Sequence, residues 1–263
     1  MQPLEALQVD LSAPADRFND PSLYPRLFVL GVAELLHVDF YGAPFEEAFD
    51  KLCERLVLPE VAPRLASVVL RAPDEGHNGT CNWDLTVLVE AEGGFPALKY
   101  FAIEQNGPDQ HNRRIVAEEY EESGAIGRLL RKAPVLDALV VPSAPDRSFF
   151  GVTGHPLRYL SVDAGYDTQG FVRELASSRS LPGLRALEFG EYSETYMDDF
   201  AARCTPLGDY ELLFKSPVFR ALNSFTLRNP VLSSQELSHL RSLAPRKDLQ
   251  FKVVRCGSEY VKA

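Results

Sequence analysis

The chain lacks the features that mark membrane and secreted proteins. No run of about 18 consecutive apolar residues occurs, and the opening MQPLEALQVDLSAPADRFND holds no apolar stretch of signal-peptide length. The composition, 45% hydrophobic and 24% charged, is otherwise that of an ordinary folded chain. We therefore expect a cytoplasmic protein that folds around an apolar core.

Cysteine is scarce. The four cysteines are far apart in sequence, and no two of them have the C-x-x-C spacing of zinc and redox sites: Cys53, Cys81, Cys204 and Cys256. A small secreted domain held by disulfides would have more cysteine in a shorter chain. We expect these residues to be reduced thiols, most of them packed in the interior.

Motifs of catalysis and nucleotide binding are missing too. H-E-x-x-H, G-x-S-x-G and G-x-x-x-x-G-K-[ST] do not occur, and the five histidines are scattered along the chain. The only combination with metal-ligand chemistry is His77, Cys81 and His111, and its spacing matches no zinc module. We therefore expect a non-catalytic protein with no metal and no cofactor.

Basic residues are fewer than acidic residues. There are 27 Lys and Arg residues against 37 Asp and Glu residues, which gives a formal net charge of −10. Such a field repels phosphate backbones and anionic lipid headgroups, so neither nucleic acid nor a membrane is expected as a partner. A basic protein would be attracted. The alternative is that the acidity only keeps the chain soluble.

What the sequence does contain is a recurring six-residue word with apolar residues at positions one, four and six. The word occurs seven times, and a degenerate copy, LQFKVV, follows at 249–254. The seven are LLHVDF at 35–40, LASVVL at 65–70, LKYFAI at 98–103, LDALVV at 136–141, LRYLSV at 157–162, LRALEF at 184–189 and LNSFTL at 222–227. Proline comes shortly before most of them, where it ends a helix and favours an extended segment.

Between the words lie segments with the apolar spacing of helices, as in Phe45, Phe49, Leu52 and Leu56. The repeating unit is therefore helix, short turn and strand. One such unit cannot bury its own apolar face, whereas stacked units pair their strands in parallel and share one core. This predicts an α/β solenoid with a parallel sheet on the concave face and helices outside. An ordinary α/β domain with a parallel sheet is the alternative.

The positions of the repeated six-residue words define the expected domain organisation. It comprises an N-terminal cap at 1–34, repeats at 35–248, and a C-terminal strand and cap at 249–263. Segment 78–94 fits either a helix or a strand, because WDLTVLVEA is rich in β-branched residues.

The word resembles the L-x-x-L-x-L consensus of leucine-rich-repeat proteins, and the resemblance covers roughly 35–254. The repeat lengths are irregular. Position nine, where the family has Asn or Cys, holds residues such as Tyr192 and Pro230. The chain therefore looks like a divergent bacterial member, and the resemblance implies a curved sheet whose concave face binds a protein.

Alternate strand residues are expected to point outward on that concave face. The candidate contact residues there are Asp39, Tyr100, Glu104, Tyr159, Asp163 and Glu188. Tyrosine supplies contact area at low entropic cost, and carboxylates attract and pair with Arg or Lys. We expect the partner to be a protein with basic character.

Two acidic stretches flank predicted elements. AEEYEESG at 117–124 precedes an apolar helical run and is expected to be a solvated helix start, with its charge at the positive end of the helix dipole. The 190–200 loop is expected to join the binding surface. Its candidate residues are Glu191, Tyr192, Glu194, Tyr196, Asp198 and Asp199.

Three functions remain open from the sequence. The first is a protein-binding scaffold, for example an immunity protein that neutralises a basic bacterial toxin. The second is an adaptor in a larger assembly, which would use the same surface. The third is a carboxylate-dependent hydrolase that combines Asp198 or Asp199 with His155 or a metal.

Overall fold

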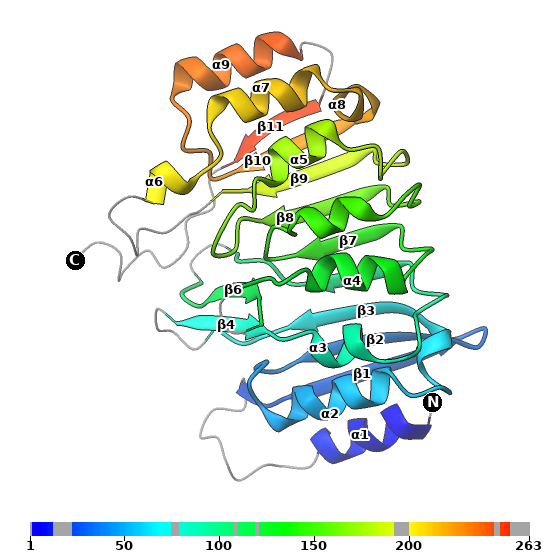
Figure 1. The fold of residues 1–263 in the computed structure, drawn as a ribbon. Coiled ribbons are helices and arrows are strands. Elements are labelled where there is room, and N and C mark those ends of the chain that lie inside the picture. Colours follow the sequence, from blue (N-terminus) through cyan, green and yellow to red (C-terminus); the bar gives the residue numbers. More distant parts are fainter. Residues whose placement is uncertain are drawn as a thin grey trace.

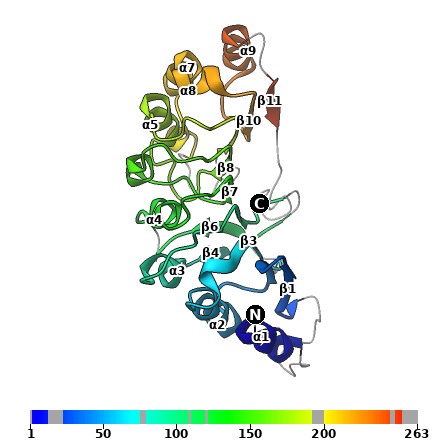
Figure 2. The ribbon, with the colours of Figure 1, turned by 90° about the vertical axis from the view of Figure 1, so that its right-hand side faces the viewer.

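The computed structural model describes residues 2–12, 23–74, 79–107, 110–118, 121–191, 200–244 and 248–252. The fold is mixed α/β, with helices packed on a mostly parallel sheet (Figure 1). Figure 2 shows the molecule as an arc, with the helices along its outer, convex side and the main sheet along its inner side.

Nine strands form the main sheet, in the order β1, β2, β3, β5, β7, β8, β9, β10, β11. The β1–β2 pair is antiparallel, and all the remaining pairs of this sheet are parallel. The bounds are β1 Arg26–Val32, β2 Leu35–Tyr41, β3 Leu65–Arg71, β5 Tyr100–Ile103, β7 Ala138–Val141, β8 Tyr159–Asp163, β9 Ala186–Gly190, β10 Ser224–Arg228 and β11 Asp248–Lys252.

Helices fill most connections between consecutive strands. The α-helices are α1 Gln2–Ser12, α2 Glu47–Leu56, α3 Thr86–Glu90, α4 Ala125–Lys132, α5 Phe171–Ser177, α6 Phe200–Arg203, α7 Leu207–Lys215, α8 Pro217–Ala221 and α9 Ser234–Leu243. Two 3-10 helices lie wholly within the described residues, η2 Ala62–Arg64 and η3 Arg147–Gly151. The connecting helices pack on one face of the main sheet, and none of the described helices covers the opposite face (Figure 2).

A second, two-stranded sheet accounts for the ambiguous segment 78–94. It pairs β4, Thr80–Trp83, in parallel with β6, Arg113–Val116. Segment 78–94 therefore contains both a strand and the short helix α3. Both β4 and β6 belong to connections between strands of the main sheet, which explains why two of the repeats are long.

Each of the seven words contains a strand of the main sheet, and in five of them the strand begins at position three. Positions one, four and six are buried in the last six words. The first word departs from this pattern, because Leu35 is exposed and Leu36 is buried instead. A register shift between Leu36 and His37, where β2 pairs with β3, accounts for the difference.

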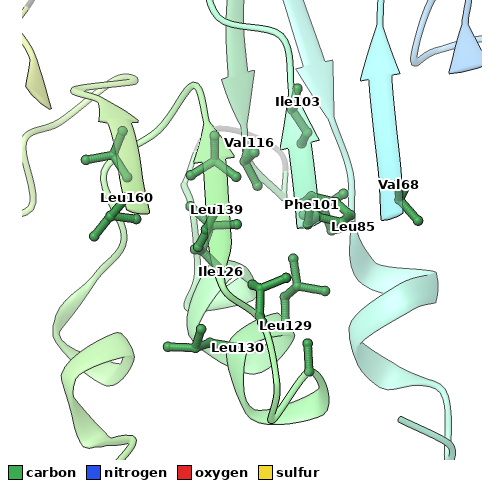
Figure 3. Close-up of a cluster of buried hydrophobic side chains, with 14 of the residues drawn as sticks. Val68, Leu85, Phe101, Ile103, Val116, Ile126, Leu129, Leu130, Leu139 and Leu160 are labelled. Atoms are coloured by element: carbon green, nitrogen blue, oxygen red, sulfur yellow. The ribbon is translucent and has the colours of Figure 1, made fainter. Parts of the chain in front are cut away.

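One continuous apolar core lies between the sheet and the helices. In its middle, Phe101, Leu139 and Leu160 project from three neighbouring strands toward Ile126 and Leu129 of α4 (Figure 3). All five side chains are buried. Burying such side chains contributes about 1.5 to 3 kcal/mol each relative to exposure, so the repeated word is the main source of stability.

The helix ends agree only in part with the sequence. Ser233 caps α9 with a complete capping box that includes Glu236, as its sequence position favours. Asp209 does not cap α7, because Pro206 holds that position and Asp209 instead pairs with Arg173, at 2.9 Å from its Nε. Among the described residues, no helix combines the length and the apolar character needed to cross a bilayer.

The acidic stretch before α4 differs from the expected solvated helix start. Glu122 is buried, and its carboxylate accepts the N–H groups of Gly124 at 3.0 Å, Ile126 at 2.5 Å and Asp146 at 3.0 Å. The Glu122 carboxylate does lie at the N-terminal, positive end of the α4 dipole, as expected, but it is buried instead of solvated. Exposed Glu121 shows the behaviour expected of the whole stretch.

The β1–β2 hairpin turns through two residues in the left-handed region, Ala33 at φ 47° and Glu34 at φ 69°. Neither is Gly or Asn, the residues that such turns favour. Arg64 Nε donates to the Glu34 carbonyl at 2.7 Å and braces the turn. The hairpin therefore carries backbone strain that a glycine would relieve.

Replacing Glu34 by Gly should raise the free energy of unfolding by about 0.5 to 1 kcal/mol, because glycine enters the left-handed region without the steric cost of a Cβ. The same replacement at Glu54, an exposed position inside α2, should lower that free energy by about 1 kcal/mol. Denaturant unfolding measures both variants. Changes of the same sign would contradict the assignment of strain to the turn.

Candidate functional site

The side of the main sheet away from the helices is the candidate site, and we call it the open face. Strand pairing aligns its outward side chains into rows that run across the sheet. One row contains Leu30, His37, Ser67, Tyr100, Ala138, Tyr159, Ala186, Ser224 and Asp248. The next contains Phe28, Asp39, Val69, Ala102, Val140, Ser161, Glu188, Thr226 and Gln250.

Arg228 is the centre of a polar cluster on β8, β9 and β10. Its Nη2 lies 2.9 Å from Asp163 Oδ1 and 3.3 Å from Ser161 Oγ. Its Nε lies 3.9 Å from Glu188 Oε2. Gly190 sits between Asp163 and Arg228 in the strand register, and a Cβ there would fall 2.0 Å from Asp163 Oδ1. The absence of a side chain at that position lets the ion pair form.

The same cluster shifts the proton affinity of two groups. Burial raises the pKa of the Asp163 carboxyl, although the Arg228 guanidinium acts in the opposite direction. Burial also raises the pKa of Tyr159 to about 12, and the neighbouring Glu188 carboxylate adds to the effect. The Tyr159 hydroxyl donates to Glu188 Oε1 at 3.0 Å. These residues are therefore fixed in place by one another.

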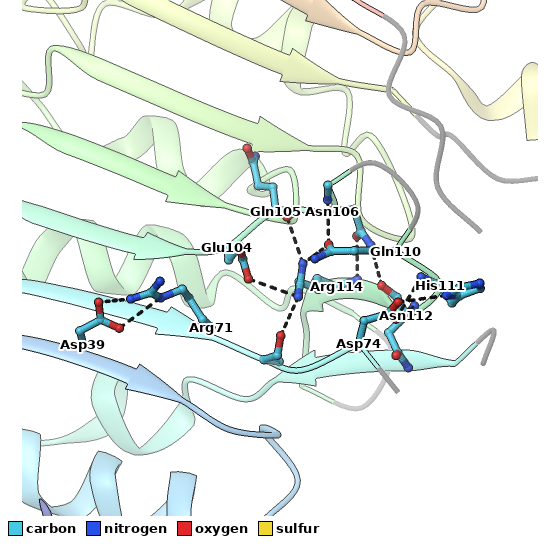
Figure 4. A network of polar contacts seen from close by, with 12 residues as sticks. Asp39, Arg71, Asp74, Glu104, Gln105, Asn106, Gln110, His111, Asn112 and Arg114 are labelled. Atoms are coloured by element: carbon cyan, nitrogen blue, oxygen red, sulfur yellow. Dashed lines mark hydrogen bonds and ion pairs between the residues drawn. The ribbon is translucent and has the colours of Figure 1, made fainter. Parts of the chain in front are cut away.

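A second arginine joins the two sheets. The Arg114 guanidinium is buried and donates to the carbonyls of Ala72 at 2.8 Å and Gln105 at 3.2 Å, just beyond β3 and β5 (Figure 4). Its Nη2 also lies 3.2 Å from Glu104 Oε2. The sequence offered no signal for this role, because strand pairing decides which carbonyl groups and which carboxylate come within reach of Arg114.

The open face is not the acidic surface expected from its carboxylates. Asp39 pairs with Arg71, Glu104 with Arg114, and both Asp163 and Glu188 with Arg228. Three arginine side chains, from β3, β6 and β10, thus balance most of the predicted negative charge. The sequence analysis placed these carboxylates on the correct face and missed their partners, because pairing depends on strand register.

An exposed apolar patch on the β1–β2 hairpin was also missed. Its members are Phe28, 60% exposed, Leu30, 47%, Val32, 50%, and Leu35, 37%. This stretch lies within 1–34, the segment expected to cap the exposed edge of the first repeat, and the exposure of its side chains was not predicted. Tyr100, 38% exposed, lies further along the row of Leu30. These side chains are the apolar contact area that the open face offers.

The 190–200 loop gives one correction. Glu191 is only 4% exposed, so it is not available as a contact residue. Its Oε1 accepts from the Tyr210 hydroxyl at 2.5 Å and from the Thr205 N–H at 3.1 Å. Burial raises the pKa of the Glu191 carboxyl. The other candidates of this loop lie outside the described residues: Tyr192, Glu194, Tyr196, Asp198 and Asp199.

The histidine of the hydrolase hypothesis has a structural role. His155 is buried, its Nε2 lies 3.0 Å from the Ala133 carbonyl, and its Nδ1 accepts from the Leu157 N–H at 3.2 Å. Both ring nitrogens are therefore occupied by backbone groups. Burial lowers its pKa, which keeps the ring neutral at pH 7.

The cysteines and the conceivable metal ligands do not form a site in the described part of the chain. Cys53, Cys81 and Cys204 are buried free thiols, whereas Cys256 and His77 lie outside the described residues. His111 Nδ1 pairs with Asp74 Oδ2 at 3.0 Å (Figure 4). Nowhere in the described ranges do three His, Cys, Asp or Glu side chains gather as metal ligands would.

Comparison with known proteins identifies no relative: no protein-family model matches the chain, and no curated protein matches it significantly. The geometry of the open face is therefore the basis on which a function can be assigned.

Replacing Arg228 by Met should lower the free energy of unfolding by about 3 kcal/mol at pH 7, because Asp163 and Glu188 lose their cation. The pKa of Asp163 then rises further, so the folded state keeps a proton that the unfolded state releases. The variant should therefore lose stability as the pH rises above about 4. Denaturant unfolding at pH 4 and pH 7 measures this.

The matched control is Arg158→Met, which breaks the exposed ion pair with Asp137 and should change the free energy of unfolding by less than about 0.5 kcal/mol. A penalty for Arg228→Met that is equal at both pH values would contradict the proposed charge balance.

Replacing Glu191 by Gln tests the buried carboxyl. Its pKa is higher in the folded state, so wild-type stability falls as the pH rises through and above about 4.3, the ordinary value. Glutamine stays neutral, so the free energy of unfolding of the variant should rise relative to that of the wild type as the pH increases. Glu236→Gln should show the opposite trend, because hydrogen bonds from Ser233 lower the pKa of Glu236. Thermal unfolding from pH 4 to pH 8 distinguishes the two.

Proposed function

We propose that the chain is a divergent leucine-rich-repeat-like solenoid that acts as a non-catalytic protein-binding scaffold. In this proposal 1–34 form the N-terminal cap, 35–248 the repeats, and 249–263 the C-terminal strand and cap. The sequential order of the parallel strands supports it, as do the buried positions one, four and six of the repeated word.

The observation that carries the proposed function is the open face itself. It is a curved surface on which Phe28, Leu30 and Tyr100 are exposed beside arginine and carboxylate side chains held by cross-strand pairs. Exposed apolar groups next to pre-organised charges are what protein interfaces use, because little side-chain entropy is lost on binding. Exposed apolar patches on a protein surface commonly mark interaction sites.

The charge of the chain bears on the kind of partner that it attracts. Because arginines neutralise most carboxylates of the open face, attraction of a basic protein depends on the net charge of −10 carried by the whole chain. An immunity protein against a basic toxin and an adaptor in an assembly both use this surface. The hydrolase alternative loses support, since His155 has no free ring nitrogen.

Alanine at both Phe28 and Tyr100 should weaken partner binding by about 30-fold or more, because aromatic anchors dominate interface energies. The matched control places alanine at Val87 and Leu212, which are 43% and 53% exposed and lie on helices α3 and α7. The partner is first isolated by affinity capture from the source cells and identified by mass spectrometry. Its affinity for each variant is then measured by calorimetry.

Thermal unfolding checks that all variants are folded. Equal affinity of the Phe28 and Tyr100 variant and the wild type would exclude the open face as the binding surface. Inhibition of a toxic activity of the isolated partner would assign the immunity role, whereas a structural component of an assembly would assign the adaptor role.

A further inference from the structure

A pocket of about 420 Å³ lies beyond the carboxyl ends of β6, β7 and β8, at the rim of the sheet. We call it the rim pocket. Its walls consist of Val116, Ala117, Glu121, Glu122, Ser143, Ala144, Ala164, Tyr166, Asp167 and Gln169. Its volume is in the range of small-ligand sites, and the carboxyl ends of parallel strands are where α/β folds bind ligands.

Glu122 is the buried carboxylate among the described lining residues, and it is 4% exposed. Its carboxylate accepts three backbone N–H groups, from Gly124, Ile126 and Asp146, and no cation among the described residues pairs with it. Burial raises its pKa, and the nearby Asp146 carboxylate adds to this effect. The buried charge is therefore held by dipoles alone, and a cation would complete it.

The mouth of the pocket adds to the negative field. Glu121 and Asp167 are exposed, and none of the ten described lining residues is basic. Two arginines next to the lining residues have other contacts: Arg113 stacks over the ring of Tyr166, itself a wall residue, at 5.0 Å, and Arg128 donates to the Ser123 carbonyl at 2.7 Å. A cavity lined by charge of one sign concentrates that field on its contents.

The remaining walls suit an alkyl chain with a polar end. Val116, Ala117, Ala144 and Ala164 form an apolar lining. The Ser143 hydroxyl is buried and accepts the Val116 N–H at 2.8 Å, which leaves a second lone pair for a ligand N–H. The pocket thus combines an apolar lining with acceptors and negative charge.

We propose that the rim pocket binds an alkylammonium or alkylguanidinium group, with the alkyl part on the alanine lining and the cationic head toward Glu122 and Asp167. Such a group is supplied either by a free amine or by a Lys or Arg side chain of the protein partner. The second source rests on the proposed scaffold function. The first does not.

Butylguanidinium is the probe, and butylurea, which has the same shape without the charge, is the matched ligand. Calorimetric titration of the full chain at low ionic strength should show saturable, one-site binding of butylguanidinium and at least tenfold weaker binding of butylurea. The variant Glu121→Gln/Asp167→Asn should weaken butylguanidinium binding at least fivefold. Asparagine keeps the oxygen that accepts the Gln169 N–H, so the loop is preserved.

The control variant Glu60→Gln/Glu92→Gln removes the same charge at exposed positions outside the pocket lining and should leave the affinity unchanged. Absence of saturable binding, equal binding of the two probes, or equal loss in both variants would overturn the proposal. Because no partner is present, these outcomes are independent of the Phe28 and Tyr100 experiment. If butylguanidinium displaces the partner, the natural ligand of the rim pocket is a Lys or Arg side chain of that partner. If it does not displace the partner, the natural ligand is a free amine.

Discussion

The parallel pairing of each strand with the next strand of the main sheet is the interaction on which the rest of the structure depends. It brings the first, fourth and sixth side chains of the last six words into a single core under the helices, and it sets the strand side chains between them in rows on the opposite face. A single repeat forms neither surface by itself. The same strand register therefore determines both the apolar core and the polar rows on the open face.

The strands and the helix-strand order were predictable from the sequence, because apolar spacing and proline punctuation are local signals that repeat. The first word shows the limit of that reasoning. Leu35 and Leu36 are equally apolar, and only the pairing with β3 decides which one is buried. The β4–β6 sheet was not predictable either. Arg114 connects it to the main sheet by hydrogen bonds to backbone carbonyl groups, and such contacts leave no pattern in the sequence.

The candidate site was predictable in its position and not in its chemistry. Alternation along the strands assigned Asp163, Glu188 and Tyr159 to the same face, as the structure has them. It did not reveal that Arg228, two strands away from Asp163, pairs with both carboxylates, nor that Glu191 is buried one residue after β9. Contacts between distant segments decide charge and exposure, and a single sequence does not encode them locally.

The arginine pairs of the inner side have a consequence for the molecule as a whole. If that side is close to electrically balanced, the formal charge of −10 is carried chiefly by the outer helices and loops. Two copies then repel each other back to back, while their inner surfaces stay accessible. Repulsion of this kind does not oppose contact through the inner side, so electrostatics leaves that side the least hindered direction of approach for a partner.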